Sequence, residues 1–363
     1  MHSCQTAGLA FLALVATGIS TRAQQPAAPT PTITVNAQLV NLPVIVRDRK
    51  GALVQNLNQA DFTLNIDGHP QTIRYFDKDN DLPLTLGLLV DTSGSVRSEL
   101  DVERIASQAF LDQLILDQAI KGQMIVAPAN RAPDQAFLIQ FAHETDLLQD
   151  LTPSRPKLRA ALNQVGVEDR DSQNQNNNGG AYGHHHGGFH GGGTTLYDAI
   201  FLASGQIMQK QHGRKALVLL TDGEDRGSME TLQSSIAAAQ RAETVVYAIY
   251  FKGEQHGYGG GHGGGFGSHG GYPGGGRGGE SHVDGKKILA QITNETGGRL
   301  FEVSDKQTFD SIYTQIAEEL RSQYRLGYTP DVAAATEGFH RVDLTIKDKK
   351  LIVQTRDGYY GGQ

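Results

Sequence analysis

Three short groups of oxygen-bearing side chains in this sequence could together bind a hard divalent cation. Residues 91–95 read Asp-Thr-Ser-Gly-Ser and supply one carboxylate and two hydroxyls, spaced two residues apart. Thr194 and Thr195 supply further hydroxyls, and Asp222 supplies a second carboxylate. Hard divalent cations prefer oxygen ligands of this kind. Because most of these ligands are neutral, a bound cation would stay under-neutralised and would favour one more anion.

Each group stands next to an element that would place it at one edge of a sheet. Residues 84–90 and 216–221 are nearly continuous apolar runs, which are typical of strands covered on both faces. The first run leads into Asp91 and the second into Asp222, whereas Thr194 comes just before a helical pattern. The motif at 91–95 alone is also common in turns and helix caps. Three such groups in order make the constellation specific.

The middle of the chain, residues 83–323, alternates strand and helix patterns. Helices are predicted at residues 96–116, 196–209, 232–242, 286–296 and 307–321, with further strands at 244–251 and 299–303 and a hairpin over 136–141 and 144–151. This alternation predicts an α/β fold with a doubly wound, Rossmann-like sheet. The sheet should be mostly parallel with one antiparallel edge strand, and its loops at the carboxyl ends of the strands should carry function.

Both flanks of this middle segment have the texture of β-structure. Residues 33–80 alternate apolar and polar side chains and contain Asp67-Gly68, a dipeptide favoured in tight hairpins. Residues 324–363 repeat the same texture, but neither flank has enough strands to hold a core alone. We therefore predict that the two flanks pair into one small all-β sandwich in which the middle is inserted. Two separate β flaps packed on the middle are the alternative.

The N-terminus is predicted to direct export. An apolar stretch at residues 7–19 is followed by small residues around a cleavage position at Ala23, which gives a signal peptide over 1–23 and a linker over 24–32. Cys4 is the only cysteine and would leave with the signal, so the mature chain would have no thiol. No second apolar run is long enough to span a membrane. The expected location is the periplasm, the cell surface or the medium.

Composition and missing motifs narrow the functional classes. The 363 residues are 38% hydrophobic and carry a net charge of −7, without any basic run. A nucleic-acid or anionic-membrane binder needs a concentrated basic face, so the charge argues against both classes. The sequence contains no P-loop, no Gly-x-Ser-x-Gly and no His-Glu-x-x-His motif. An aspartyl phosphotransferase would need a second carboxylate at the place of Ser93, so no enzymatic activity is expected.

The middle segment resembles the von Willebrand factor type A family with its metal-ion-dependent adhesion site. The flanking sequences resemble an exported acidobacterial subgroup of that family. The resemblance implies a site made of Asp91, Ser93, Ser95, Thr194 and Asp222. In that family the two serines and the threonine bind Mg²⁺ directly, and the two aspartates act mostly through water. The sixth position takes an Asp or Glu carboxylate of a partner protein.

The resemblance leaves two choices at this site. Mn²⁺ or Ca²⁺ could take the place of Mg²⁺. Thr195 could take the role of Thr194, although the spacing to the following helix favours Thr194. Nearby, Asp198 falls in the first turn of that helix, where its charge suits the helix dipole. Glu224 and Asp225 follow Asp222 in a loop, where they either support the metal ligands from behind or are simply solvated.

Two tracts rich in glycine and histidine depart from the family pattern. They occupy residues 174–193 and 253–281 and hold 24 of the 44 glycines. If the strand over 244–251 is parallel to its neighbours, both tracts emerge at the metal edge. Eight of the 13 histidines lie in or beside them: His184, His185, His186, His190, His256, His262, His269 and His282.

Imidazole favours Zn²⁺, Ni²⁺ or Cu²⁺ over Mg²⁺. Ordered transition-metal binding, loose metal capture and a merely solvated collar all remain open for the two tracts. The sequence therefore favours an exported, non-enzymatic binding or adhesion protein that recognises a partner carboxylate through Mg²⁺. An envelope protein that scavenges transition metals through its histidines is the alternative.

Overall fold

The computed structural model describes seven stretches of the chain: residues 39–78, 82–96, 100–115, 132–166, 193–252, 284–330 and 337–362. The predicted signal peptide and linker lie outside the described residues. The same holds for both glycine and histidine tracts except Gly193. All of the described stretches lie within one unit, Ala37–Gln363.

A six-stranded sheet forms the centre of the fold. Its order is β10-β9-β8-β5-β6-β7, and every neighbouring pair is parallel except β6 and β7 at one edge. This confirms the predicted doubly wound sheet with one antiparallel edge strand. The strands are β5 (Leu84–Asp91), β6 (Gln135–Phe141), β7 (Thr145–Thr152), β8 (Arg214–Thr221), β9 (Val245–Tyr250) and β10 (Leu300–Glu302).

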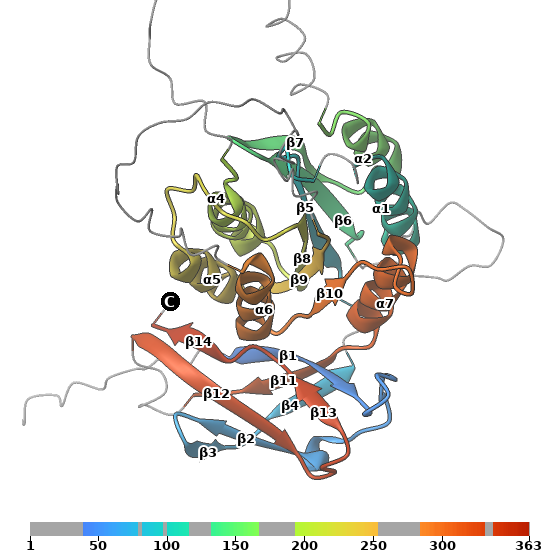
Figure 1. The fold of residues 1–363 in the computed structure, drawn as a ribbon. Helices are drawn as coiled ribbons and strands as arrows, with labels where there is room; N and C mark the ends of the chain where they lie inside the picture. The colour runs from blue at the N-terminus through green and yellow to red at the C-terminus, as the bar shows by residue number, and fades with distance from the viewer. Residues whose placement is uncertain are drawn as a thin grey trace, which may run out of the picture. The chain divides into compact units, whose positions relative to one another are not determined.

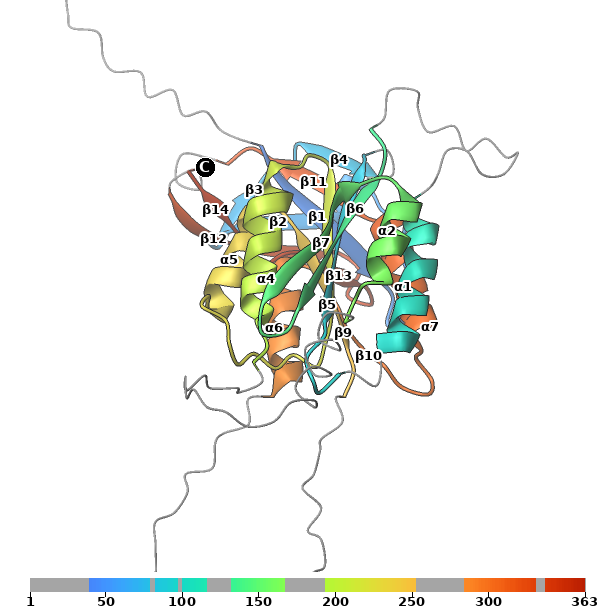
Figure 2. The ribbon, with the colours of Figure 1, turned by 90° about the horizontal axis from the view of Figure 1, so that it is seen from above.

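Helices cover both faces of this sheet. One face carries α4 (Leu196–Leu202), α5 (Leu232–Arg241) and α6 (Gly285–Thr296), and the other carries α1 (Leu100–Leu114), α2 (Arg155–Leu162) and α7 (Phe309–Arg321) (Figures 1 and 2). All eight residues of β5 are buried as a result. Side chains that alternate along a strand enter opposite cores, so Leu88 packs with α1 and α7 while Leu89 packs with α4.

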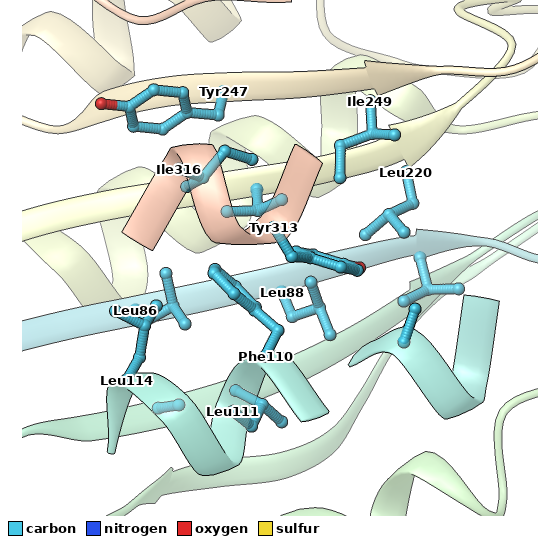
Figure 3. Packing of buried hydrophobic residues seen from close by; sticks show 14 of the residues in the cluster. Leu86, Leu88, Phe110, Leu111, Leu114, Leu220, Tyr247, Ile249, Tyr313 and Ile316 are labelled. Carbon is cyan, nitrogen blue, oxygen red and sulfur yellow. The ribbon is translucent and has the colours of Figure 1, made fainter. Parts of the chain in front are cut away.

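The core beneath α1 and α7 is built around two aromatic rings. Phe110 of α1 and Tyr313 of α7 stack with their ring centroids 4.3 Å apart. They lie over Leu86 and Leu88 of β5, and Leu220 of β8 completes this part of the cluster (Figure 3). The hydroxyl of Tyr313 finds a partner in Ser107, 2.7 Å away. A buried aromatic hydroxyl is thereby satisfied inside an otherwise apolar layer.

One helix of the middle segment was not anticipated, and the extent of another was wrong. No prediction covered the residues after β7, where α2 forms with a proline in its first turn. Its exposed face is rich in basic residues, which weakens the apolar periodicity. The helix expected over 196–209 ends as an α-helix at Leu202 and continues as a π turn, Ala203–Ile207, and a 3₁₀ turn, Met208–Lys210. Gly205 lies inside the π turn, and glycine weakens an α-helix.

Strands from both ends of the described chain form two antiparallel four-stranded sheets. The first has the order β13-β1-β11-β4 and the second the order β14-β12-β2-β3. Their bounds are β1 (Val40–Arg47), β2 (Phe62–Ile66), β3 (His69–Gln71), β4 (Tyr75–Lys78), β11 (Tyr324–Tyr328), β12 (Gly338–Ile346), β13 (Ile352–Gln354) and β14 (Gly358–Gly361). Strand β1 pairs with β11, and β2 pairs with β12.

One apolar core fills the space between these two sheets. Leu42 and Leu64 from the N-terminal strands pack with Tyr324 and Leu344 from the C-terminal strands. The hairpin predicted at Asp67-Gly68 is confirmed, since it joins β2 to β3 and both residues have positive φ, 51° and 81°.

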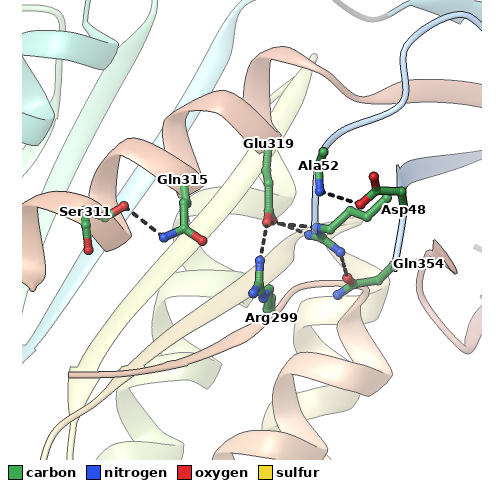
Figure 4. A network of polar contacts seen from close by, with 8 residues as sticks. Asp48, Ala52, Arg299, Ser311, Gln315, Glu319 and Gln354 are labelled. Carbon is green, nitrogen blue, oxygen red and sulfur yellow. Dashed lines mark hydrogen bonds and ion pairs between the residues drawn. The ribbon is translucent and has the colours of Figure 1, made fainter. Parts of the chain in front are cut away.

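A buried ion pair joins this sandwich to α7. Arg47 at the end of β1 places Nη2 2.6 Å from Oε2 of Glu319, and the side chains are 8% and 3% exposed. Glu319 also forms an ion pair with Arg299, and Arg47 donates a hydrogen bond to the side chain of Gln354 on β13 (Figure 4). Removing one member of a buried pair leaves an uncompensated charge, so this network fixes α7 against β1. None of the described helices is both long and apolar enough to cross a membrane.

Candidate metal centre

Asp91 is the innermost of the predicted site residues. It is the last residue of β5 and its side chain is fully buried. Oδ1 accepts the backbone N–H of Ser93 at 2.9 Å, and Oδ2 accepts the hydroxyl of Thr221 at 2.6 Å. Both carboxylate oxygens are thus held by residues at the carboxyl ends of β5 and β8. The orientation of Asp91 is fixed before any ligand binds.

Three more predicted residues continue this cluster. Ser95 donates its hydroxyl to Oδ2 of Asp222 at 2.6 Å, and the hydroxyls of Ser93 and Ser95 lie 3.3 Å apart. Oδ1 of Asp222 accepts the backbone N–H of Glu224 at 3.1 Å. The structure therefore brings Asp91, Ser93, Ser95 and Asp222 together at the edge of the sheet.

A glycine is required directly after Asp222. Gly223 has a φ of +78°, and a Cβ added there would come within 2.4 Å of the carbonyl oxygen of Gly285 at the start of α6. Gly285 is equally constrained, because its Cβ would lie 2.3 Å from the carbonyl oxygen of Asp222. Only glycine avoids both the strain and the collision. This tight turn fixes where the Asp222 carboxylate lies.

Two carboxylates share this edge, and one of them is deeply buried. Burial raises the pKa of Asp91 to about 7, and the negative charge of Asp222 contributes a smaller rise. Hydrogen bonds from Ser93 and Thr221 act in the opposite direction and lower the pKa. A carboxyl group perturbed in this way gains from a nearby positive charge. The described residues contain no group of three or more His, Cys, Asp and Glu side chains placed to hold a metal. The ligands present are carboxylates and hydroxyls, which fit a hard divalent cation.

The structure distinguishes Thr194 from Thr195. The hydroxyl of Thr195 lies 2.9 Å from the hydroxyl of Thr145 on β7, and its backbone N–H donates to Ala142. Thr195 is thus tied to the β6–β7 side. The carbonyl of Thr194 accepts the N–H groups of Arg226 and Gly227 at 3.0 and 3.2 Å, which attaches it to the loop that follows Asp222. Within the described ranges, no hydrogen bond occupies the Thr194 hydroxyl.

The loop over residues 225–230 is held against the start of α4. Ser228 accepts the N–H groups of Tyr197 and Asp198 at 3.1 and 3.2 Å and donates to Asp225 at 2.5 Å. Asp198 in turn accepts the N–H groups of Met229 and Glu230. The expected role of Asp198 as a partner of the helix dipole is therefore incomplete, because its carboxylate anchors this loop.

The predicted tracts begin or end close to this edge. Gly193, the last residue of the first tract, donates its N–H to Nδ1 of His143 at 3.1 Å. Strand β9 runs parallel to β8. The prediction that the second tract emerges at the metal edge depended on this parallel direction. The histidines proposed to bind transition metals all lie outside the described residues.

Thr221 is a functional residue of this edge that the sequence motifs do not mark. It is fully buried, donates to Asp91 and accepts the N–H of Gly223 at 3.0 Å, so it links both carboxylate-bearing turns. A polar residue at the end of an otherwise apolar strand was the available signal. The loop amides of Arg226 and Gly227 carry no such signal, because any residue supplies an N–H.

Comparisons with known proteins give one family match and several matches to solved structures. Residues 86–224 match the family model described as von Willebrand factor type A domain. BatB, a conserved hypothetical protein from Bacteroides thetaiotaomicron, matches with a TM-score of 0.40 and 14% identity over 65% of this chain and 98% of its own. A von Willebrand factor type A protein from Catenulispora acidiphila matches with a TM-score of 0.42 and 12% identity over 84% and 74%.

Proximal thread matrix protein 1 from the mussel byssus, solved with a zinc-occupied MIDAS motif, also matches. Its TM-score is 0.40 and its identity 14%, over 70% of this chain and 49% of its own. No curated protein matches the sequence.

Proposed function

Because the chain carries a von Willebrand factor type A domain, we propose that its metal edge binds a divalent cation and uses it to recognise a partner protein. The proposed ligands are Asp91, Ser93, Ser95, Thr194 and Asp222. Mg²⁺ is the proposed cation, with Mn²⁺ or Ca²⁺ as substitutes. Domains of this family typically act as binding modules rather than as enzymes, and we propose the same for this chain.

The hydrogen-bonded cluster at the ends of β5 and β8 carries this proposal. Ser95 and Asp222 come from segments 127 positions apart and meet at 2.6 Å. Asp91 is locked by Ser93 and Thr221 at the same edge. Such preorganisation is costly unless it serves a ligand, because two carboxylates are brought close together and one of them is buried.

Each side chain has a distinct part in the proposed site. The hydroxyls of Ser93, Ser95 and Thr194 would contact the cation directly, while Asp91 and Asp222 would hold its water ligands. The cation, when bound, would supply an open position for an Asp or Glu carboxylate of the partner. Hydroxyls favour this outcome because they leave the positive charge largely uncompensated.

The wider setting is also a proposal. We propose that residues 1–23 direct export and that the protein acts in the periplasm, at the surface or outside the cell. The β-sandwich, fixed to α7 through Arg47 and Glu319, would present the metal edge to the partner. Transition-metal scavenging by the histidine tracts falls outside the described residues.

Isothermal titration with Mg²⁺ tests the metal site. Ser95→Ala removes one proposed ligand and the hydrogen bond to Asp222, so it should weaken Mg²⁺ binding at least tenfold. Asp305→Ala is the control, because Asp305 is exposed and its side chain forms no hydrogen bond or ion pair with the described residues. An unchanged Mg²⁺ affinity in Ser95→Ala would contradict the assignment. A parallel titration with Ni²⁺ separates binding by the histidine tracts.

Capture experiments test the second half of the proposal. The immobilised protein should retain a partner in Mg²⁺, release it in EDTA, and fail to retain it as Ser95→Ala. Replacing the partner's contacting Asp or Glu by Asn or Gln should abolish capture. A partner that binds equally in EDTA would show that recognition does not pass through the metal.

A further inference from the structure

A cavity of about 180 Å³ lies at the opposite edge of the central sheet, where β8 and β9 begin. Its walls come from residues 211–215 and the start of β9 on one side, and from β1 and β11 of the sandwich on the other. This volume equals roughly six water molecules at their share of the liquid. The cavity has room for a small ion and its hydration water.

Lys215 is a lining residue whose positive charge is partly buried and forms no hydrogen bond or ion pair with any described residue. Burial lowers the pKa of Lys215, and the charge of Arg356 adds to this effect while Glu243 opposes it. Holding a cation away from water without a partner costs free energy. A ligand that brings negative charge would recover that cost.

Other charged groups surround Lys215 in this wall. Among the described lining residues Glu243 is the one carboxylate, and it is shared with Arg356, which lies 3.5 Å from it. Arg325 adds a second positive charge and approaches Asp77 only to 4.0 Å. Arg214 adds a third, with its guanidinium held by the carbonyls of Leu82 and Leu320 at 3.0 and 2.8 Å. Among the described lining residues, Lys215, Arg214 and Arg325 are basic and Glu243 is acidic.

A neutral hydrogen-bond donor completes the wall. The side-chain amide of Asn41, on β1, makes no hydrogen bond with the described residues. Together, the Lys215 ammonium, the Arg325 guanidinium and this amide offer N–H donors from both sides of the cavity. Charge-assisted hydrogen bonds of this kind are roughly twice as strong as neutral ones.

We propose that this cavity is a binding site for a small tetrahedral oxyanion, phosphate or sulfate, held by Lys215, Arg325 and Asn41. An oxyanion with several acceptor oxygens matches N–H donors that different strands supply to one cavity. The site is separate from the metal edge, because it lies where the strands begin rather than where they end. Asn41 and Arg325 belong to the sandwich and Lys215 to the central sheet, so the anion would link the two parts.

Titration of inorganic phosphate into the full chain tests this site. The titration is done in EDTA to keep cations from the metal edge, and at constant ionic strength set with NaCl. Phosphate should bind the wild type with 1:1 stoichiometry and raise its unfolding temperature. Lys215→Met keeps most of the side-chain volume, and it should weaken phosphate binding at least tenfold. Arg325→Gln should weaken it in the same direction.

Two comparisons make the result decisive. Lys157→Met changes an exposed lysine on α2, away from the cavity, and should leave the phosphate affinity unchanged. Sulfate should compete with phosphate. The proposal is overturned if phosphate stabilises the wild type no more than NaCl at equal ionic strength, or if Lys215→Met folds and keeps the wild-type affinity. Neither result depends on whether the metal edge binds Mg²⁺.

Discussion

Thr221 provides a stringent test of how the metal edge is built. Thr221→Val removes a hydroxyl that donates to Asp91 at 2.6 Å and accepts from Gly223 at 3.0 Å, all within a fully buried region. A hydrogen bond to an ionised group contributes about 1.5 to 3 kcal/mol, and a buried N–H left without a partner costs about 1 to 3 kcal/mol. The expected loss is the sum of the two, about 2.5 to 6 kcal/mol.

Urea denaturation in EDTA at pH 8 measures this loss. At pH 8 the Asp91 carboxyl, whose pKa burial raises to about 7, is mostly ionised, and EDTA removes any stabilisation by bound metal. Thr85→Val is the matched control, because Thr85 lies on the buried strand β5 and its hydroxyl forms no hydrogen bond in the described part of the chain. The control should lose less than about 1 kcal/mol. Equal losses in the two variants would refute the assigned role of Thr221.

Three further predictions follow from the same contacts. Gly223→Ala should lower the free energy of unfolding, measured by urea denaturation, by at least about 2 kcal/mol, because backbone strain adds to a collision with α6. Gly51→Ala should lower it by about 1 kcal/mol, because Gly51 has a φ of +89° but no neighbour within 4 Å of an added Cβ. Equal losses in the two variants would contradict the close approach of Gly223 to α6. Thr194→Val should weaken Mg²⁺ binding at least tenfold, as measured by calorimetry. Thr195→Val should keep the Mg²⁺ affinity but lower the free energy of unfolding by about 1 kcal/mol, because it removes the hydrogen bond to Thr145. The reverse pattern would exchange the roles of the two threonines. Burial, and then Glu295, raise the pKa of Asp357 to about 6, so the folded state binds this proton more tightly and stability should fall as the pH rises from about 4 to 6. Asp357→Asn should remove this pH-dependent loss of stability. The loss amounts to less than about 1 kcal/mol, because the Asp357 side chain is exposed. A variant with the same pH profile of stability as the wild type would contradict this prediction.

The sequence predicts the central sheet well because its strands are covered on both faces. Apolar runs such as the one that ends at Asp91 can hardly be anything but buried strands. The order of strand and helix patterns then places Asp91 and Asp222 at one edge without further information. Four of the five candidate ligands meet there in the structure.

The parts that the sequence does not predict depend on contacts between distant segments. The bond from Thr221 to Asp91 joins residues 130 positions apart, and only their side-by-side strands bring them together. The register of the sandwich, in which Leu64 faces Leu344, is likewise set by long-range packing. The helix α2 escapes prediction because it is short and its exposed face is basic. Backbone donors such as the N–H of Arg226 leave no trace in residue type.

A crystal structure with Mn²⁺ in place of Mg²⁺ tests the central claim most directly, because the anomalous scattering of manganese locates the ion without reference to the surrounding protein. The account predicts one strong anomalous peak among the hydroxyls of Ser93, Ser95 and Thr194, with Asp91 and Asp222 behind them. The peak should disappear in crystals of Ser95→Ala. A protein that crystallises with millimolar Mn²⁺ and shows no peak at this edge, or that holds its manganese only elsewhere, would contradict the account.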